Sequence, residues 1–141
     1  MKESMEKHWI EYEEEEIYKE NILDHFRHPR NFGELKQCSF SHCELNPVCG
    51  DMIQMFVLLD GVRIKDVRFK GSGCAISIAC ASMLTDYLKG KSIWEIKRMD
   101  KEVVLNMLGI NLGVVRIKCG LLALKTVLGG LRKMEVSFKN E

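Results

Sequence analysis

The sequence predicts a single domain that contains both strands and helices. A length of 141 residues suits one hydrophobic core rather than two. Residues 53–69 form two β-prone runs joined by Asp60-Gly61, a strong signal for a tight hairpin turn. Residues 75–89 instead place apolar side chains at helical spacing and stop before Gly90. We therefore expect one mixed domain over residues 1–141.

Composition narrows the function classes. Apolar residues make up 46% and charged residues 29% of the chain, as in globular proteins, and the net charge is +1. This balance favours neither nucleic acid nor an acidic membrane as partner, and no apolar run reaches the roughly 18 residues of a membrane span. The charged N-terminus lacks a secretory apolar core. Six cysteines without an export signal predict a reducing cytoplasm, where thiols bind metal or react.

The N-terminal quarter is expected to be helical. Residues 1–16 form an acidic extension, which we interpret as an exposed helix start or frayed end rather than a docking arm. Residues 17–27 place Tyr18, Ile22 and Phe26 on one helical face, which ends at His28-Pro29. His25 and His28 are candidate metal ligands, but the hydrogen-bonded structural role is the favoured interpretation.

The strands are expected between residues 35 and 69. Residues 35–45 resemble a first strand, and it holds Cys38 and Cys43. These two cysteines are five apart, unlike a zinc knuckle, so we expect them to be small, partly buried residues. In the second strand of the hairpin, the apolar residues change from even positions (Ile64) to odd positions (Val67). This break in the alternation predicts a bulge near Lys65-Asp66.

The second half is predicted to be mainly helical. The helix of residues 75–89 has one apolar stripe, and Cys80 is part of it, so Cys80 is expected in the core. The stripe consists of Ile76, Ala79, Cys80, Met83, Leu84, Tyr87 and Leu88. Ser92-Ile93-Trp94-Glu95 fits a capping box that opens a short helix. Another short helix over 100–108 ends at Gly109, and 110–116 are expected to be a loop.

A last helix is expected to begin near Cys119. Its inward side chains are predicted to be Leu121, Leu124, Leu128 and Leu131. Gly129-Gly130 weakens the helix, and the pattern leaves open whether it ends there.

The most informative stretch is the loop Asn46-Pro47-Val48-Cys49-Gly50-Asp51. Pro47 has no amide hydrogen and ends a preceding strand, while Gly50 permits a bend closed to other residues. Cys49 and Asp51 therefore flank a bend where both side chains can converge. A thiolate and a carboxylate on one tight turn are suitable first members of a metal site.

Two further cysteines stand in similar surroundings. Cys74 directly precedes the helix of 75–89, and Cys119 is expected to open the last helix, after Arg116 and Lys118. The dipole and free amides of a helix N-terminus lower the pKa of a thiol, and the two cations add to this effect. Both cysteines are therefore expected to be thiolates that bind a soft metal or react with sulfur.

The hairpin should bring these groups together. Because the ends of a hairpin are adjacent, Cys49, Asp51 and Cys74 should meet at one edge of the sheet. One carboxylate among three thiolates is unusual for a structural zinc site, which prefers sulfur alone or sulfur with imidazole. A hard oxygen ligand on a soft centre should make the site easier to open, which suits something assembled and then released.

With these residues in view, the chain resembles the iron–sulfur cluster assembly scaffolds of the IscU, NifU N-terminal and SufU group. The likeness runs from about Tyr18 to Leu131. Its marks are Asp24-His25, Pro29-Arg30-Asn31-x-Gly33, Cys49-Gly50-Asp51, Gly73-Cys74-Ala75-Ile76-Ser77, Lys89-Gly90-Lys91 and Arg116-Ile117-Lys118-Cys119. Several motifs in the right order are highly specific, whereas any one alone would be weak.

The resemblance implies an α+β fold, with a three-stranded antiparallel sheet packed against helices and a metal site at one end of the sheet. It implies that Cys49, Cys74 and Cys119 hold a nascent iron–sulfur cluster, foremost of the 2Fe-2S type, with Asp51 alongside and zinc as another occupant. The implied partners are a cysteine desulfurase or another sulfide source and recipient apoproteins, and a homodimer around the cluster is compatible with it. The implied role is that of a scaffold, not an enzyme.

The chain departs from the group in three ways. IscU-type scaffolds carry histidine where Lys118 stands, and SufU-like members share the lysine, which as a protonated amine cannot bind metal. The SufU type has an insertion between its second and third cysteines, for which Cys74 and Cys119 are too close. The chaperone motif Leu-Pro-Pro-Val-Lys of IscU is replaced by residues 112–116 without prolines.

Two other functions compete with the scaffold. One is a zinc-dependent sulfurtransferase, similar to SufU, that accepts persulfide sulfur from a cysteine desulfurase. The other is a structural zinc module with closed, inert coordination. Metal analysis and visible absorbance after anaerobic purification distinguish the three.

Overall fold

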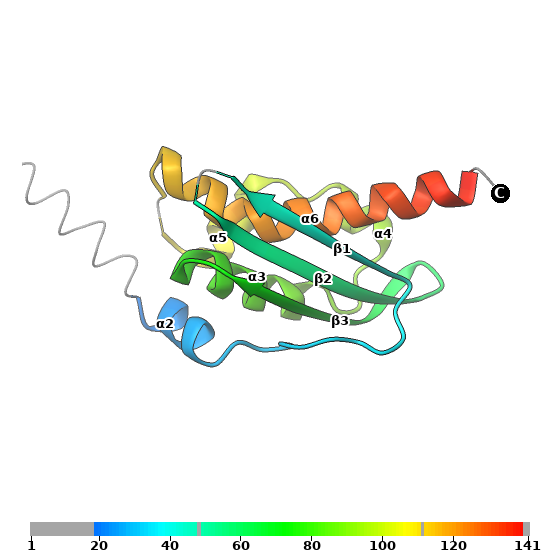
Figure 1. The fold of residues 1–141 in the computed structure, drawn as a ribbon, viewed down its shortest axis with the longest axis horizontal. Helices are drawn as coiled ribbons and strands as arrows, with labels where there is room; N and C mark the ends of the chain where they lie inside the picture. Colours follow the sequence, from blue (N-terminus) through cyan, green and yellow to red (C-terminus); the bar gives the residue numbers. More distant parts are fainter. Residues whose placement is uncertain (1–18, 48, 111, 140–141) are drawn as a thin grey trace, which may run out of the picture.

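The computed structural model of the chain describes residues 19–47, 49–110 and 112–139. The predicted acidic extension of residues 1–16, Tyr18 of the first helix and Val48 of the site loop lie outside the described residues. The described chain forms a three-stranded sheet with helices packed against it, which confirms the expected α+β fold (Figure 1).

The sheet is antiparallel with the order β1-β2-β3. Strand β1 spans Phe40–Asn46, β2 spans Asp51–Asp60 and β3 spans Arg63–Ser72. The first strand begins five residues later than predicted, because residues 35–39 belong to the loop before it. The register between β2 and β3 shifts after Leu58↔Asp66 to Leu59↔Ile64, so Lys65 is the extra residue of the predicted bulge.

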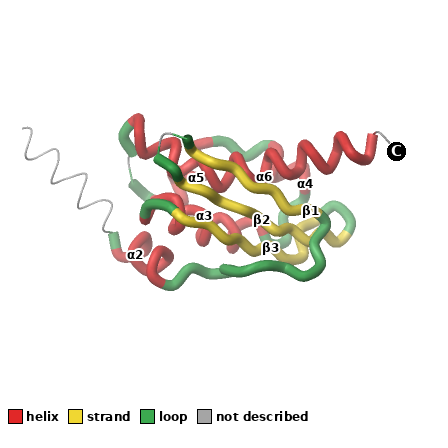
Figure 2. Tube along the Cα trace, in the orientation of Figure 1, coloured by secondary structure: helices red, strands yellow, loops and turns green. Residues whose placement is uncertain are grey.

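The first described helix, α2 (Glu20–Arg27), packs on the helix that follows the sheet. Ile22 is buried as predicted, whereas the Phe26 side chain is 40% exposed. After α2, the chain runs along the outer edge of β3, where Phe32 pairs with Phe69 in parallel (Figure 2). The amide of Gly33 donates to the Phe69 carbonyl at 2.9 Å, so this part of the β3 edge is covered.

Helix α3 (Ala75–Leu88) confirms the clearest helix prediction, but it is buried more widely than one stripe. Ser77, Ser82 and Thr85 are buried together with the apolar residues, because α2 and α6 as well as the sheet contact this helix. Tyr87, predicted to face inward, is 41% exposed. Its neighbour Lys91 instead places its ammonium 4.8 Å from the centre of the Tyr87 ring.

Two short helices follow. Helix α4 (Ile93–Lys97) begins with the predicted capping box, in which the Ser92 hydroxyl accepts from the Glu95 amide and the Glu95 carboxylate accepts from the Ser92 amide. Helix α5 (Lys101–Leu108) ends at Gly109, which adopts a left-handed conformation as a C-terminal cap.

The last helix, α6 (Val114–Lys139), differs from the prediction at both ends. It begins five residues before Cys119, so residues 114–116 are helical rather than part of a loop. It also continues through Gly129-Gly130, and these glycines let the helix approach β1 closely. A Cβ on Gly130 would lie 2.5 Å from the Phe40 ring, and one on Gly129 would lie 2.7 Å from the His42 ring.

The core lies between the sheet and helices α3 and α6. The inward residues of β2 alternate as Ile53, Met55 and Val57, all fully buried. Of the predicted inward leucines of α6, Leu124 and Leu131 are buried, whereas Leu121 and Leu128 are half-buried. None of the helices in the described parts of the chain is long and apolar enough to span a membrane.

Candidate metal centre

The β1–β2 turn places the first two candidate ligands. Asn46 ends β1 and pairs with Asp51, the first residue of β2. Gly50 has a φ of 75°, and its amide donates to the Asn46 carbonyl at 2.7 Å, so the bend predicted from glycine is present. Cys49 is exposed at this turn, whereas Asp51 is only 3% exposed.

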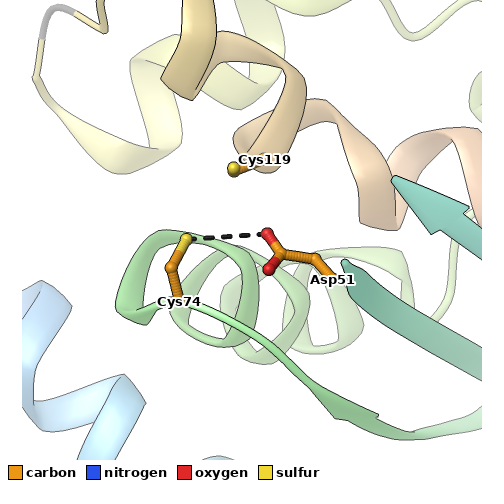
Figure 3. A group of neighbouring side chains, drawn as sticks. All are labelled: Asp51, Cys74 and Cys119. Carbon is orange, nitrogen blue, oxygen red and sulfur yellow. Dashed lines mark hydrogen bonds between the residues drawn. The ribbon is translucent and has the colours of Figure 1, made fainter. Parts of the chain in front are cut away.

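Cys74 lies beside Asp51 at the same end of the sheet. It follows the last residues of β3 and is the N-cap residue of α3. The Cys74 thiol donates to Asp51 Oδ2 over 3.7 Å (Figure 3). The hairpin was predicted to bring Cys49, Asp51 and Cys74 together, and this is confirmed for Asp51 and Cys74. Cys49 instead contacts Cys119, the remaining candidate cysteine.

Cys119 comes from α6 and approaches from the opposite side, as Figure 3 shows. It is 3% exposed, its Sγ lies 3.8 Å from Cys49 Sγ, and the Asn46 side-chain amide donates to it over 3.9 Å. Because α6 begins at Val114, Cys119 lies in the second turn of the helix, and the prediction that it occupies the N-terminus is wrong.

The donor atoms are close enough to share one metal ion. One ligand atom each from Asp51, Cys74 and Cys119 lie within 4.8 Å of one another. In a tetrahedral zinc site, two sulfur ligands are about 3.8 Å apart, and sulfur and oxygen are about 3.5 Å apart. The separations of Cys49 from Cys119 and of Cys74 from Asp51 match these spacings. The donor set therefore fits zinc, and its thiolates also fit iron bound to sulfide.

The protonation of the thiols depends on what the site holds. Burial raises the pKa of Cys119, and hydrogen bonds of its thiol to the Asp51 carboxylate and with the neighbouring cysteines raise it further. This is opposite to the lowered pKa that a helix N-terminus would produce. A metal cation reverses the balance, because a coordinating thiol loses its proton. Metal binding at Cys119 is therefore linked to proton release.

Lys118 and Arg116 are exposed, one and three positions before Cys119 in the sequence. Lys118 lines a hollow of about 340 Å³ whose other walls are Leu45, Asn46, Pro47, Leu121, Leu122 and Lys125. This hollow lies next to the β1–β2 turn, and of the described side chains that contact the candidate ligands only Asn46 lines it.

The remaining candidate residues lie away from this centre. The His25 ring nitrogen Nδ1 is 2.7 Å from Ser82 Oγ, which is the structural role favoured above. Cys80 is fully buried, its thiol donates to the Gly120 carbonyl, and burial raises its pKa to about 12. Cys38 and Cys43 are exposed, so the prediction that they are partly buried is wrong. Cys43 lies on the open face of the edge strand β1, which explains its exposure.

Sequence reasoning missed two side chains that contact the ligands. The first is Asn46, described above, and the second is Ser77, whose hydroxyl donates to Asp51 Oδ2 at 2.6 Å. Ser77 lies three residues after Cys74, on the same side of the first turn of α3, and this spacing is the signal that could have identified it.

The chain matches a family model described as the NifU-like N terminal domain over residues 17–139. It is 37% identical over 136 residues to the zinc-dependent sulfurtransferase SufU of Bacillus subtilis, which takes in 84% of this chain and 92% of that protein. It is 37% identical over 93 residues to the iron–sulfur cluster assembly scaffold protein IscU 1 of Archaeoglobus fulgidus. This second alignment takes in 66% of the chain and 61% of the relative, so it spans about three fifths of that protein's length.

A solved structure has the same fold. It is described as a candidate iron–sulfur cluster assembly scaffold protein for the SUF system from Fervidobacterium islandicum AW-1. The two superimpose with a TM-score of 0.71 at 30% identity, over 82% of this chain and 96% of that one. The chain therefore belongs to the NifU-like N-terminal domain family, as its resemblance to IscU, NifU and SufU proteins indicated.

Proposed function

We propose that this protein is a scaffold that assembles an iron–sulfur cluster and passes it to apoproteins. The observation that carries the proposal is the convergence of Asp51, Cys74 and Cys119 within 4.8 Å, with Cys49 beside them. Cys49, Cys74 and Cys119 would hold the cluster as thiolates, and Asp51 would be the fourth ligand. The cluster, foremost of the 2Fe-2S type, is then the cargo of the protein.

The uneven burial of the four ligands suits assembly followed by transfer. Cys49 and Cys74 are exposed, so iron, sulfide and an acceptor can reach them from solvent. Cys119 and Asp51 are buried and anchor the inner side. Asp51 is a harder ligand than the thiolates and binds iron of a sulfide cluster more weakly, so it is the natural position at which an acceptor thiolate enters.

The alternative function is a zinc-dependent sulfurtransferase. The similarity to SufU of Bacillus subtilis and the spacing of the donor atoms, which fits zinc, support it. In such a reaction a thiolate of this chain attacks the outer sulfur of a donor persulfide, a new sulfur–sulfur bond forms, and the donor thiolate leaves. The alignment to SufU is 136 positions long, but only 84% of the 141 residues of this chain take part in it. Some aligned positions of SufU therefore have no counterpart in this chain. This difference agrees with the absence of the SufU insertion, which does not by itself decide between the two functions.

A lysine next to Cys119, a source of sulfur and recipient proteins would take part in this function. Lys118 is exposed and would support thiolate formation or partner contact without binding metal, since a coordinating amine must first lose its proton. A cysteine desulfurase or another source of sulfide would supply sulfur, and apo iron–sulfur proteins would accept the cluster. Exposed thiols at the centre suit a reducing cytoplasm, which we propose as the location.

Metal analysis of anaerobically purified protein tests these functions. The protein is then treated with ferrous iron, sulfide and reductant, followed by visible spectroscopy and incubation with an apo-ferredoxin. A scaffold should develop visible cluster absorbance that moves to the ferredoxin. A sulfurtransferase should instead keep one zinc and accelerate sulfide release by a desulfurase. Retained zinc with neither activity would leave only a structural zinc module.

A further inference from the structure

Asp51 is held by a buried serine that the proposed ligand set does not include. Ser77 is the third residue of α3 and is 1% exposed. Its hydroxyl donates to Asp51 Oδ2 at 2.6 Å, and its oxygen lies 3.5 Å from Cys74 Sγ. One hydroxyl group thus contacts two of the proposed ligands.

This hydroxyl is used differently from the two buried threonine hydroxyls of the helices. Thr85 donates to the Ser82 carbonyl and Thr126 to the Leu122 carbonyl, each within its own helix, both at 2.7 Å. Such local bonds satisfy a buried hydroxyl without any distant partner. The Ser77 hydroxyl instead reaches across to the first residue of β2, which is 26 positions away in the sequence.

The backbone of Gly73 lies against the same carboxylate on another side. A Cβ on Gly73 would lie 2.8 Å from both Cγ and Oδ1 of Asp51, so only glycine leaves room for the carboxylate in this position. Asp51 is therefore confined between a hydroxyl donor and a bare stretch of backbone. A buried carboxylate that accepts a short hydrogen bond has little freedom to rotate.

We propose that Ser77 is a positioning residue that holds the Asp51 carboxylate toward the metal. The hydroxyl donates a hydrogen bond to Oδ2 of Asp51. The carboxylate therefore keeps its orientation when its bond to the metal breaks, and it can bind the metal again. This inference rests on the proposed function, in which Asp51 is a ligand. It predicts that Ser77 acts on metal binding chiefly through Asp51, with which it makes the shorter of its two contacts.

The experiment compares Ser77→Ala with Ser82→Ala, a fully buried serine of the same helix that contacts His25 and the Arg30 amide instead. Zinc affinity is measured by chelator competition, and the visible spectrum of the cobalt-substituted protein reports the ligand set. Ser77→Ala should weaken zinc binding about 10- to 100-fold, as loss of a partner that orients a ligand does, and should alter the cobalt spectrum. Ser82→Ala should leave both unchanged, and Ser77→Thr, which keeps the hydroxyl, should restore most of the affinity.

A double-mutant cycle separates positioning from general damage. In the Asp51→Ala background, Ser77→Ala should have much less effect on zinc affinity than in the wild type. Gly73→Ala, which displaces the carboxylate from the other side, should weaken zinc in the wild-type background and much less when Asp51 is alanine. This second variant tests whether the confinement of the Asp51 carboxylate matters for zinc binding, and Ser77→Val, which matches Ser77→Thr in shape but lacks the hydroxyl, tests the role of Ser77 if Ser77→Ala fails to fold.

Three outcomes would overturn the inference. An equal loss from Ser77→Ala with and without Asp51 would show that Ser77 acts on the fold. Unchanged affinity in Ser77→Ala, with a clear loss in Asp51→Ala, would reject the role of Ser77 while leaving Asp51 a ligand. Unchanged affinity in Asp51→Ala would reject the ligand assignment in the proposed function, and the inference with it.

Discussion

The three proposed cysteine ligands are distinguished by their surroundings rather than by their residue type. Cys49 lies on a turn, Cys74 caps a helix, and Cys119 lies inside a helix, yet all three face one point at the end of the sheet. Cys43, in contrast, lies on the exposed face of β1, away from this point. The position of the sulfur atom therefore decides which thiols can act together.

The first prediction is that Cys49→Ser, Cys74→Ser and Cys119→Ser each weaken zinc binding and cluster formation. Serine is a poor ligand for a soft metal. Loss of a residue that only orients a ligand weakens metal binding by up to about 100-fold, and loss of a ligand itself should weaken zinc binding by more than that. Chelator competition and visible absorbance after reconstitution measure the two effects.

The matched controls are Cys38→Ser and Cys43→Ser, which change exposed thiols, and Cys80→Ser, which changes a buried one. Serine at position 80 can still donate to the Gly120 carbonyl. All three controls should bind metal as the wild type does. If Cys38→Ser abolished binding in a folded protein, the ligand set would be wrong.

The second prediction is that Asp51→Ala keeps its cluster longer in air and transfers it more slowly. A carboxylate binds iron of a sulfide cluster weakly and attracts water and protons that assist ligand exchange. In this variant, an external thiol can take the fourth ligand position of a cluster beside the three cysteines. A mononuclear zinc site instead loses one of its four ligands, so zinc affinity should fall.

The measurement pairs the decay of cluster absorbance in air with the rate of transfer to apo-ferredoxin, in wild type and variant. A variant that loses its cluster faster, or transfers it at the same rate, would show that Asp51 is an ordinary stabilising ligand or takes no part.

At the scale of elements, the contact between α6 and β1 depends on the absence of two side chains. Gly129 and Gly130 lie against His42 and Phe40, where a Cβ would come within 2.7 Å and 2.5 Å of the rings. The same helix carries Cys119 three turns earlier. The close approach of α6 to β1 therefore also sets the position of Cys119 relative to the β1–β2 turn.

The third prediction is that Gly130→Ala destabilises the protein, by about 1–3 kcal/mol, because the methyl group overpacks the interface with Phe40. In an exposed helix the same change would stabilise by about 0.5–1 kcal/mol. Urea unfolding of the apo protein measures the difference in the free energy of unfolding.

Ser137→Ala, at an exposed position of α6, is the control and should be neutral or slightly stabilising. A stabilising effect of Gly130→Ala would mean that α6 does not lie this close to β1 in solution.

At the scale of the whole molecule, α2 is joined to the body by polar contacts around Ser82. His25 Nδ1 lies 2.7 Å from the Ser82 hydroxyl, and the Arg30 amide donates to the same oxygen at 2.8 Å. Burial lowers the pKa of His25, and the Arg30 guanidinium lowers it further, while Asp24 and Asp86 oppose this effect. The folded protein therefore prefers neutral His25.

The fourth prediction follows from this preference. Because the folded pKa lies below the unfolded value of about 6.5, the unfolded chain binds more protons, and stability falls as the pH drops through and below that value. The full contribution is present above about pH 7.5. In His25→Gln, which stays neutral, the decrease should be smaller. Urea unfolding of reduced apo protein between about pH 8 and 5 measures it.

The carboxyl groups of Asp24 and Glu44 also have lowered pKa values, Asp24 through Arg30 and Glu44 through His42. Their contributions disappear only at more acidic pH, below their usual values near 4, and so do not mask the effect of His25. Identical pH profiles of wild type and His25→Gln would rule out His25 as the group responsible.

Local sequence alone determined one half of the metal centre. Pro47 and Gly50 specify the bend, and Asp60-Gly61 specifies the hairpin, so Asp51 and Cys74 had to meet at one end of the sheet. The bulge, the capping box and the glycine stop of α5 were predictable for the same reason. Each depends on residues that are near neighbours in the chain or are joined by a short turn.

Tertiary structure decided the other half. Cys119 lies 70 residues from Cys49, and no local pattern indicates that α6 begins at Val114 or continues through Gly129-Gly130. The helix continues because its two glycines fit against β1, and packing of this kind outweighs weak helix propensity. Burial of Cys119, its raised pKa and the bond from Ser77 to Asp51 likewise arise only when α3, α6 and the sheet are packed, since desolvation depends on what surrounds a group in space.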